Sequence, residues 1–160
     1  MVFPYIRQSI AIILFAVATL AGAAEINAKV IAITDGDTCK VLDKNSVQYI
    51  IRLHGIDSPE RKQAFGTQAK KYLSELIFGK EVKVVYSSKD RYGRILGKIY
   101  IGASYVNLKM VEAGFAWHYV KYAPKDDDLA KAEADARKGK VGLWGGEVLA
   151  PWEFRKGIRK

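Results

Sequence analysis

The chain has 160 residues and a formal net charge of +9 at pH 7, with 26 lysines and arginines against 17 aspartates and glutamates. This length allows one domain with a hydrophobic core and excludes two domains of ordinary size. The basic charge favours a polyanionic partner, because a positive surface attracts phosphate chains and gains from counterion release; nucleic acid fits, as do anionic membranes and cell-wall polymers.

The first element in chain order is a targeting segment. Arg7 precedes an apolar stretch over residues 10–24, about 15 residues, which is shorter than the roughly 20 that a membrane-spanning helix needs. The stretch ends in Ala21-Gly22-Ala23, an A-x-A cleavage pattern. We therefore expect a signal peptide over residues 1–23 and a mature chain that is secreted or periplasmic, with an uncleaved anchor as the alternative.

Short β segments and helices follow. The strands are expected over residues 29–34, 38–42, 47–56, 81–87 and 95–101, with turn-forming residues between them. A helix over 67–78 has apolar residues at i, i+3, i+4, i+7 and i+8, and Gly79 stands at its C-terminal end. A second helix is expected over 106–113 and a third over 126–139, where three aspartates can cap its start.

This order of elements is typical of an OB-type barrel. The predicted fold is α+β, mainly β: a five-stranded OB-type barrel with about three helices. One domain is expected over residues 24–148, followed by a loosely held basic tail over 149–160. The single cysteine, Cys39, leaves no internal disulfide and is expected to be a buried, unreactive thiol. His54 and His118, in predicted strand segments, are expected to be structural.

Three segments combine carboxylates with guanidinium groups. They are DGDT at residues 35–38, RLHGIDSPE at 52–60 and DRYGR at 90–94. Phosphodiester hydrolysis builds negative charge on the phosphate, which a hard divalent cation with oxygen ligands can neutralise while it supplies bound water. Asp37 and Asp57 are the candidate ligands, with the Ser58 backbone carbonyl as a third; Asp35 either supports them or only forms the turn.

The remaining groups of these segments suit the same reaction. Glu60 is the candidate general base, although a glutamate after Ser-Pro can also cap a turn. Arg52 and Arg94 are the candidate phosphate clamps, because a planar guanidinium donates two parallel hydrogen bonds and keeps its charge. Arg52 lies in an apolar run, where an unpaired charge is costly, and this favours a functional role.

The three segments, in this order, resemble the staphylococcal nuclease (thermonuclease) family. The likeness runs without large gaps from about residue 29 to residue 144 and includes GFAWHYVKYAP at 114–124 and GLW at 142–144. The resemblance implies one Ca²⁺ on the ligands named above and Glu60 as base. It also implies that Tyr92 and Tyr122 bind the nucleotide. Val120 stands where a further pocket tyrosine is expected, and the adjacent Tyr119 is the candidate replacement.

We expect an exported, metal-dependent, sugar-non-specific nuclease that acts on DNA and RNA, favours single-stranded or frayed regions, and is a monomer without a stable protein partner. The resemblance implies that cleavage leaves 3′-phosphate ends. The alternative is a catalytically silent OB-type module that binds single-stranded nucleic acid; a basic envelope-binding protein would explain the charge but not the carboxylates. The acids favour the enzyme, because carboxylates repel a phosphate ligand unless a cation is present.

Overall fold

The computed structural model describes residues 23–158 of the chain. The predicted signal peptide lies outside the described residues except for Ala23. Within the described range, no helix combines the length and the apolar character needed to cross a membrane.

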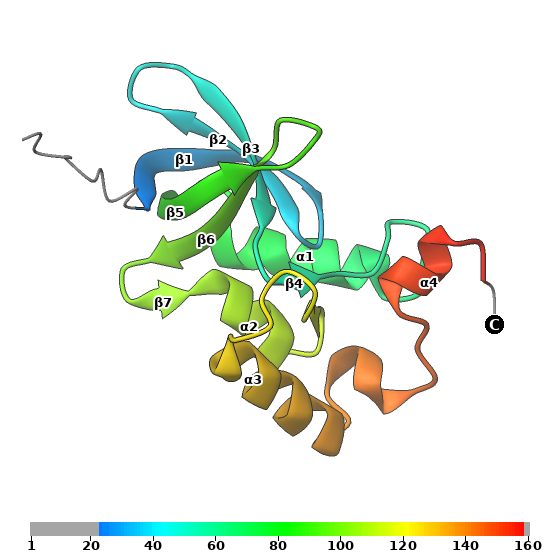
Figure 1. Cartoon of the computed structure of the whole chain (residues 1–160). Coiled ribbons are helices and arrows are strands. Elements are labelled where there is room, and N and C mark those ends of the chain that lie inside the picture. The colour runs from blue at the N-terminus through cyan, green and yellow to red at the C-terminus, as the bar shows by residue number, and fades with distance from the viewer. Residues whose placement is uncertain (1–22, 159–160) are drawn as a thin grey trace, which may run out of the picture.

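Five strands close into a barrel (Figure 1). They are β1 (Ala24–Asp35), β2 (Thr38–Asp43), β3 (Gln48–Leu53), β5 (Glu81–Lys89) and β6 (Ile95–Ile101). The order is β3-β2-β1-β5-β6 with antiparallel neighbours, and a parallel pairing of β3 with β6 completes the circle. The α+β, OB-type prediction is confirmed.

The three predicted helices are present close to their expected bounds. They are α1 (Gly66–Ile77), α2 (Val106–Glu112) and α3 (Asp127–Lys138), and in Figure 1 they gather at one end of the barrel. Several shorter elements were not predicted: strands β4 (Ile56–Asp57), β7 (Ser104–Tyr105) and β8 (Trp117–His118), the 3-10 helix η1 (Gly142–Gly145) and helix α4 (Pro151–Arg155). The two-residue strands depend on their pairing partners and leave no periodic pattern in the sequence.

The main core fills the barrel and the space under α1. Val41, Ile51 and Ile99 are fully buried inside the barrel, as their alternation along β2, β3 and β6 requires. Cys39 is also fully buried, as predicted, and burial raises the pKa of its thiol to about 12, which disfavours the reactive thiolate. His118 is buried with its Nε2 2.7 Å from the Ala123 carbonyl oxygen, consistent with a structural role.

A smaller aromatic cluster holds helix α4, so the expectation of a loosely held tail is wrong for this helix. Trp152 of α4 packs edge-on against Trp117 at 6.3 Å between ring centroids and stacks on Tyr119 at 5.6 Å. Pro151 occupies the first turn of α4, where its missing N–H is harmless. A helix of five residues is not stable alone in water, so this packing keeps α4 in place.

Gly36 offers a test of how tightly the DGDT turn packs. A Cβ at this position would lie 2.7 Å from the Ala69 Cβ and 2.8 Å from the Ser58 Cβ. We expect Gly36→Ala to lower the free energy of unfolding by about 1–3 kcal/mol, as overpacking does, measured by urea denaturation. Gly146→Ala is the control, because its added Cβ meets no atom within 4 Å. Equal losses in the two variants would contradict this packing.

Candidate active site

The three charged segments meet at one cavity of about 710 Å³. Every residue predicted to act in the site lines this cavity: Asp35, Asp37, Arg52, Asp57, Ser58, Glu60, Tyr92, Arg94, Tyr119 and Tyr122. The cavity therefore collects carboxylates, guanidinium groups and aromatic rings from segments far apart in the sequence.

Barrel closure brings these segments together. Arg52 of β3 pairs with Thr38 of β2 on one side and with Leu96 of β6 on the other. Asp37 immediately precedes Thr38, and Arg94 lies two residues before Leu96, so both flank Arg52. The DGDT, RLHGIDSPE and DRYGR segments lie far apart in the sequence. They are neighbours in the fold because β3 pairs with a strand on each of its edges.

Arg52 connects the two predicted metal ligands. Its Nη1 lies 3.0 Å from Asp37 Oδ2, and its Nη2 lies 2.8 Å from Asp57 Oδ1. The Asp57 side chain is only 1% exposed. One guanidinium therefore neutralises part of the charge of two buried carboxylates and fixes their orientation.

The Asp37 carboxylate still lacks sufficient compensating charge. Burial raises the pKa of Asp37 to about 7; Arg52 opposes this shift, and the neighbouring carboxylates Asp35 and Asp57 add to it. The Ser58 N–H also donates to Asp37 Oδ2 at 2.7 Å. A further positive charge close to this carboxylate would lower its pKa again.

Asp37 and Asp57 fit a hard divalent cation in the chemistry of their oxygen donors. No group of three or more His, Cys, Asp or Glu side chains among residues 23–158 forms a complete metal site. Hard cations held by only one or two carboxylates keep several waters and contact substrate phosphates. Two buried carboxylates, one with its pKa raised, match that kind of site better than a closed structural one.

Ser58 contributes its amide and hydroxyl to the architecture. Its Oγ lies 3.0 Å from the carbonyl oxygens of both Gly36 and Phe115, and donates its proton to one of them. These contacts tie the turn after β4 to the DGDT turn. The role of the Ser58 carbonyl as a metal ligand stays a prediction.

Arg94 is oriented by the turn that precedes it. Asp90 Oδ1 accepts the N–H groups of Tyr92 and Arg94, and Asp90 Oδ2 accepts Arg94 Nε at 2.7 Å. Within residues 23–158, no hydrogen bond occupies the terminal nitrogens of Arg94. Those nitrogens are available for a phosphate.

Aromatic and basic side chains form the rim. Tyr122 is 55% exposed and meets Tyr119 edge-on at 5.0 Å between centroids. Lys89, Arg91 and Lys121 line the same cavity. Val120 is exposed and Tyr119 lines the cavity; a nucleotide-binding role of Tyr119 stays a prediction. The rim thus combines surfaces for base stacking with positive charge for a phosphate chain.

Sequence reasoning missed several cavity residues, among them His54 and Arg155. His54 lies in the turn between β3 and β4, not in a strand, and lines the cavity; burial lowers its pKa, and Lys98 contributes. Arg155 of α4 places its Nη2 2.7 Å from Asp57 Oδ2 and its Nη1 2.7 Å from Glu60 Oε1. The basic tail carried no local pattern that pointed to this contact.

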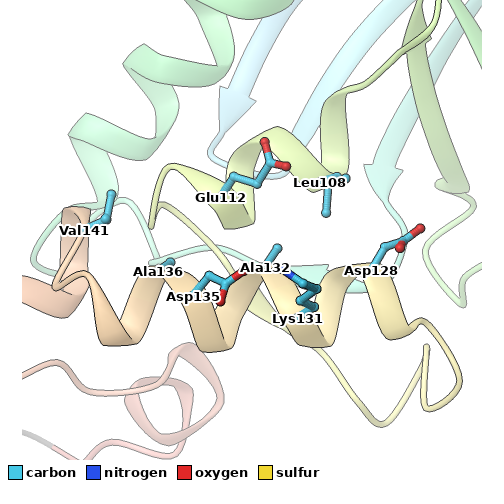
Figure 2. Close-up of a pocket in the computed structure, with 8 residues that line it drawn as sticks. All are labelled: Leu108, Glu112, Asp128, Lys131, Ala132, Asp135, Ala136 and Val141. Carbon is cyan, nitrogen blue, oxygen red and sulfur yellow. Dashed lines mark hydrogen bonds and ion pairs between the residues drawn. The ribbon is translucent and has the colours of Figure 1, made fainter.

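A second hollow of about 350 Å³ lies between α2 and α3 (Figure 2). Three of its charged lining residues form ion pairs: Lys131 lies 2.6 Å from Asp135, and Glu112 lies 2.8 Å from Lys109. These are exposed ion pairs of neighbouring helix positions. The hollow is a solvated groove without converging free groups, and the chemistry belongs to the larger cavity.

Comparison with known proteins agrees with the geometry. The sequence profile described as Staphylococcal nuclease homologue matches residues 50–146. The chain belongs to the staphylococcal nuclease family. It is 39% identical over 151 residues to an uncharacterized endonuclease of Escherichia coli, a match that covers 93% of this chain and 97% of that protein.

The matched region makes up a different share of each relative in the staphylococcal nuclease family. The micrococcal nuclease of Shigella flexneri is 38% identical over 144 residues, covering 83% of this chain and 82% of that protein. The staphylococcal-like nuclease CAN1 of Arabidopsis thaliana is 45% identical over 113 residues, covering 70% of this chain but 35% of the plant protein. The chain thus spans about a third of that relative. The resemblance seen in the sequence is confirmed.

The raised pKa of Asp37 predicts a pH dependence of stability. Burial raises the pKa of folded Asp37 to about 7 from its ordinary value of 3.8, so the folded state binds more protons than the unfolded state between these pH values. Without metal, raising the pH from 5 to 8 should therefore destabilise the native chain relative to Asp37→Asn. Urea denaturation in chelator measures both; a stability difference that is the same at the two pH values would contradict the prediction.

Proposed function

We propose that the chain is an exported, calcium-dependent, sugar-non-specific nuclease that hydrolyses phosphodiester bonds in DNA and RNA and leaves 3′-phosphate ends. One observation carries the proposal: two carboxylates bridged by Arg52, a candidate base and a second arginine line the same cavity. Membership of a family whose relatives are named as nucleases supports the reaction class.

The side chains of the cavity divide the chemical work. Glu60 Oε1 accepts a hydrogen bond from Arg155 Nη1. Glu60 therefore accepts the proton of the attacking water at its other oxygen, Oε2. Arg94, oriented by Asp90, donates to the phosphate oxygens as their charge increases in the transition state. Arg52 holds Asp37 and Asp57 and adds positive charge on the same side. A cation held by Asp37 and Asp57 would lower the pKa of a water and neutralise phosphate charge.

The rim of the cavity suits a nucleic acid with either sugar, deoxyribose or ribose. Stacking on the exposed rings of Tyr92 and Tyr122 tolerates any base, and phosphate contacts carry no sequence information. A base that is unpaired can reach these rings more easily than a base inside a duplex. The preference for single-stranded or frayed regions, and action as a monomer, are part of the proposal.

Export is proposed from the sequence of the N-terminal segment. The short apolar stretch and the Ala21-Gly22-Ala23 pattern support cleavage and release to the periplasm or the medium. A calcium-dependent enzyme suits such a location, because weak extracellular calcium sites work at about 10⁻⁴–10⁻³ M.

The silent binding module is the weaker interpretation. Asp35, Asp37, Asp57 and Glu60 all line the cavity, where they repel a phosphate chain unless a cation is present. A module that only binds single strands gains from basic and aromatic groups and loses from these acids.

An activity gel on denatured DNA and on RNA tests the nuclease and its metal. We expect cleavage with calcium and its loss in excess chelator, because the acids then crowd like charges around the substrate. Asp37→Asn should lose activity, whereas Asp128→Asn, an exposed change on α3, should retain it. Undiminished cleavage after careful metal removal would contradict the metal; retardation without cleavage under all conditions would support the binding module.

Arg94 should act mainly in the transition state. Arg94→Ala should reduce kcat by roughly a hundred- to a thousandfold, or about 2.7–4 kcal/mol, as removal of one oxyanion donor does. Arg94→Lys should restore little, because an ammonium group lacks the planar fork. Tyr122→Ala should instead raise KM by removing a stacking surface. Steady-state kinetics on folded variants measure these effects, and near-native kcat in both Arg94 variants would exclude Arg94 from the catalytic site.

A further inference from the structure

Arg155 reaches the carboxylates from a separate part of the chain. Its Nη1 and Nη2 lie 3.2 Å and 2.7 Å from the two oxygens of Asp57, and Nη1 also lies 2.7 Å from Glu60 Oε1. The bonds to Asp57 and Glu60 raise the pKa of Arg155, so it stays charged. One planar guanidinium thus joins a predicted metal ligand to the predicted base.

Glu60 depends on this contact for its position. The side chain follows Pro59 in the irregular segment after β4 and is 38% exposed. Arg155 is the one group within residues 23–158 that hydrogen-bonds the Glu60 carboxylate. A half-exposed glutamate without such a bond would sample several rotamers, and only some of them would meet the attacking water.

The anchoring of α4 makes the contact a permanent part of the fold. Trp152 packs on both Trp117 and Tyr119, and the Gln63 side-chain amide donates to the Leu149 carbonyl. Release of Arg155 by movement of α4 would expose this aromatic surface to water, which is unfavourable. The geometry therefore favours an Arg155–Glu60 contact that persists, and not one that breaks and re-forms in each catalytic cycle.

We propose that Arg155 is a positioning residue: it fixes the Glu60 carboxylate beside Asp57, and this makes the C-terminal helix α4 part of the catalytic apparatus. The inference rests on the proposed nuclease function. It separates Arg155 from Arg52 and Arg94, because Arg155 acts through Glu60 and is not assigned to the phosphate.

The experiment compares Arg155→Gln, Arg155→Lys and Lys156→Gln. Lys156 is the exposed neighbour at the end of the same helix and serves as the charge-matched control. Steady-state kinetics on denatured DNA at saturating calcium give kcat and KM. Isothermal titration with calcium alone gives the metal affinity of each folded variant.

For Arg155→Gln we expect kcat to fall about 10–100-fold with KM little changed, as loss of an orienting partner does. Calcium affinity should be retained or increased, because a positive charge beside Asp57 is removed. Arg155→Lys should recover part of kcat, and Lys156→Gln should match the native chain. Trp152→Ala, which undocks α4 while leaving Arg155 in the chain, should reproduce the loss of kcat.

Three results would overturn the proposal. Higher activity together with tighter calcium binding in Arg155→Gln would make Arg155 a competitor of the metal. A parallel loss of activity and calcium affinity would give it only a structural role, and unchanged kinetics would give it none. If the native chain itself shows no cleavage, the proposed function fails and this inference falls with it, whereas an active native chain with unaffected variants refutes the inference alone.

Discussion

The Arg52 guanidinium between Asp37 and Asp57 is the interaction on which the rest of the site depends. Two buried carboxylates so close together repel each other, and neither can stay charged without a nearby cation. Arg52 contacts both, at 3.0 Å and 2.8 Å, from near the C-terminal end of β3. Arg155 adds a second positive charge, with its Nη2 2.7 Å from Asp57 Oδ2, and burial keeps the pKa of Asp37 raised despite Arg52. In the proposed function, Asp37 and Asp57 are the carboxylates that would hold the divalent cation.

The position of Arg52 in turn requires the barrel to close. β3 pairs with β2 on one edge and with β6 on the other, and only the second pairing brings the DRYGR turn near the RLHGIDSPE segment. An open sheet with the same strands would keep the Asp37 contact and lose Arg94. The parallel β3–β6 pairing therefore brings the charged residues of this chain into one site. The fold alone does not specify the chemistry, which depends on these residues.

The sequence predicted what local patterns encode. The five barrel strands and three helices follow from alternation, helical periodicity and turn residues, and the cavity residues follow from the carboxylate and arginine motifs. Arg155 could not be found in this way, because its partner Asp57 is 98 residues away and a basic tail looks the same whether it is solvated or docked. The apolar signal was present in Trp152, whose packing on Trp117 holds α4, but a single tryptophan does not reveal its partner.

The same aromatic contacts hold helix α4 beside a site of high charge. Ion pairs between partly exposed groups contribute little to stability by themselves, and the Arg155 and Glu60 side chains are 43% and 38% exposed. The apolar packing of Trp152 is therefore the stronger attachment of α4, and it is insensitive to salt and to the charge of a bound substrate. Trp117, which pairs with Asp57 across β8 and β4, belongs to this surface. The Trp117 side chain therefore packs against Trp152 of α4, while its backbone pairs with that of Asp57. This links the aromatic packing directly to the position of the Asp57 carboxylate.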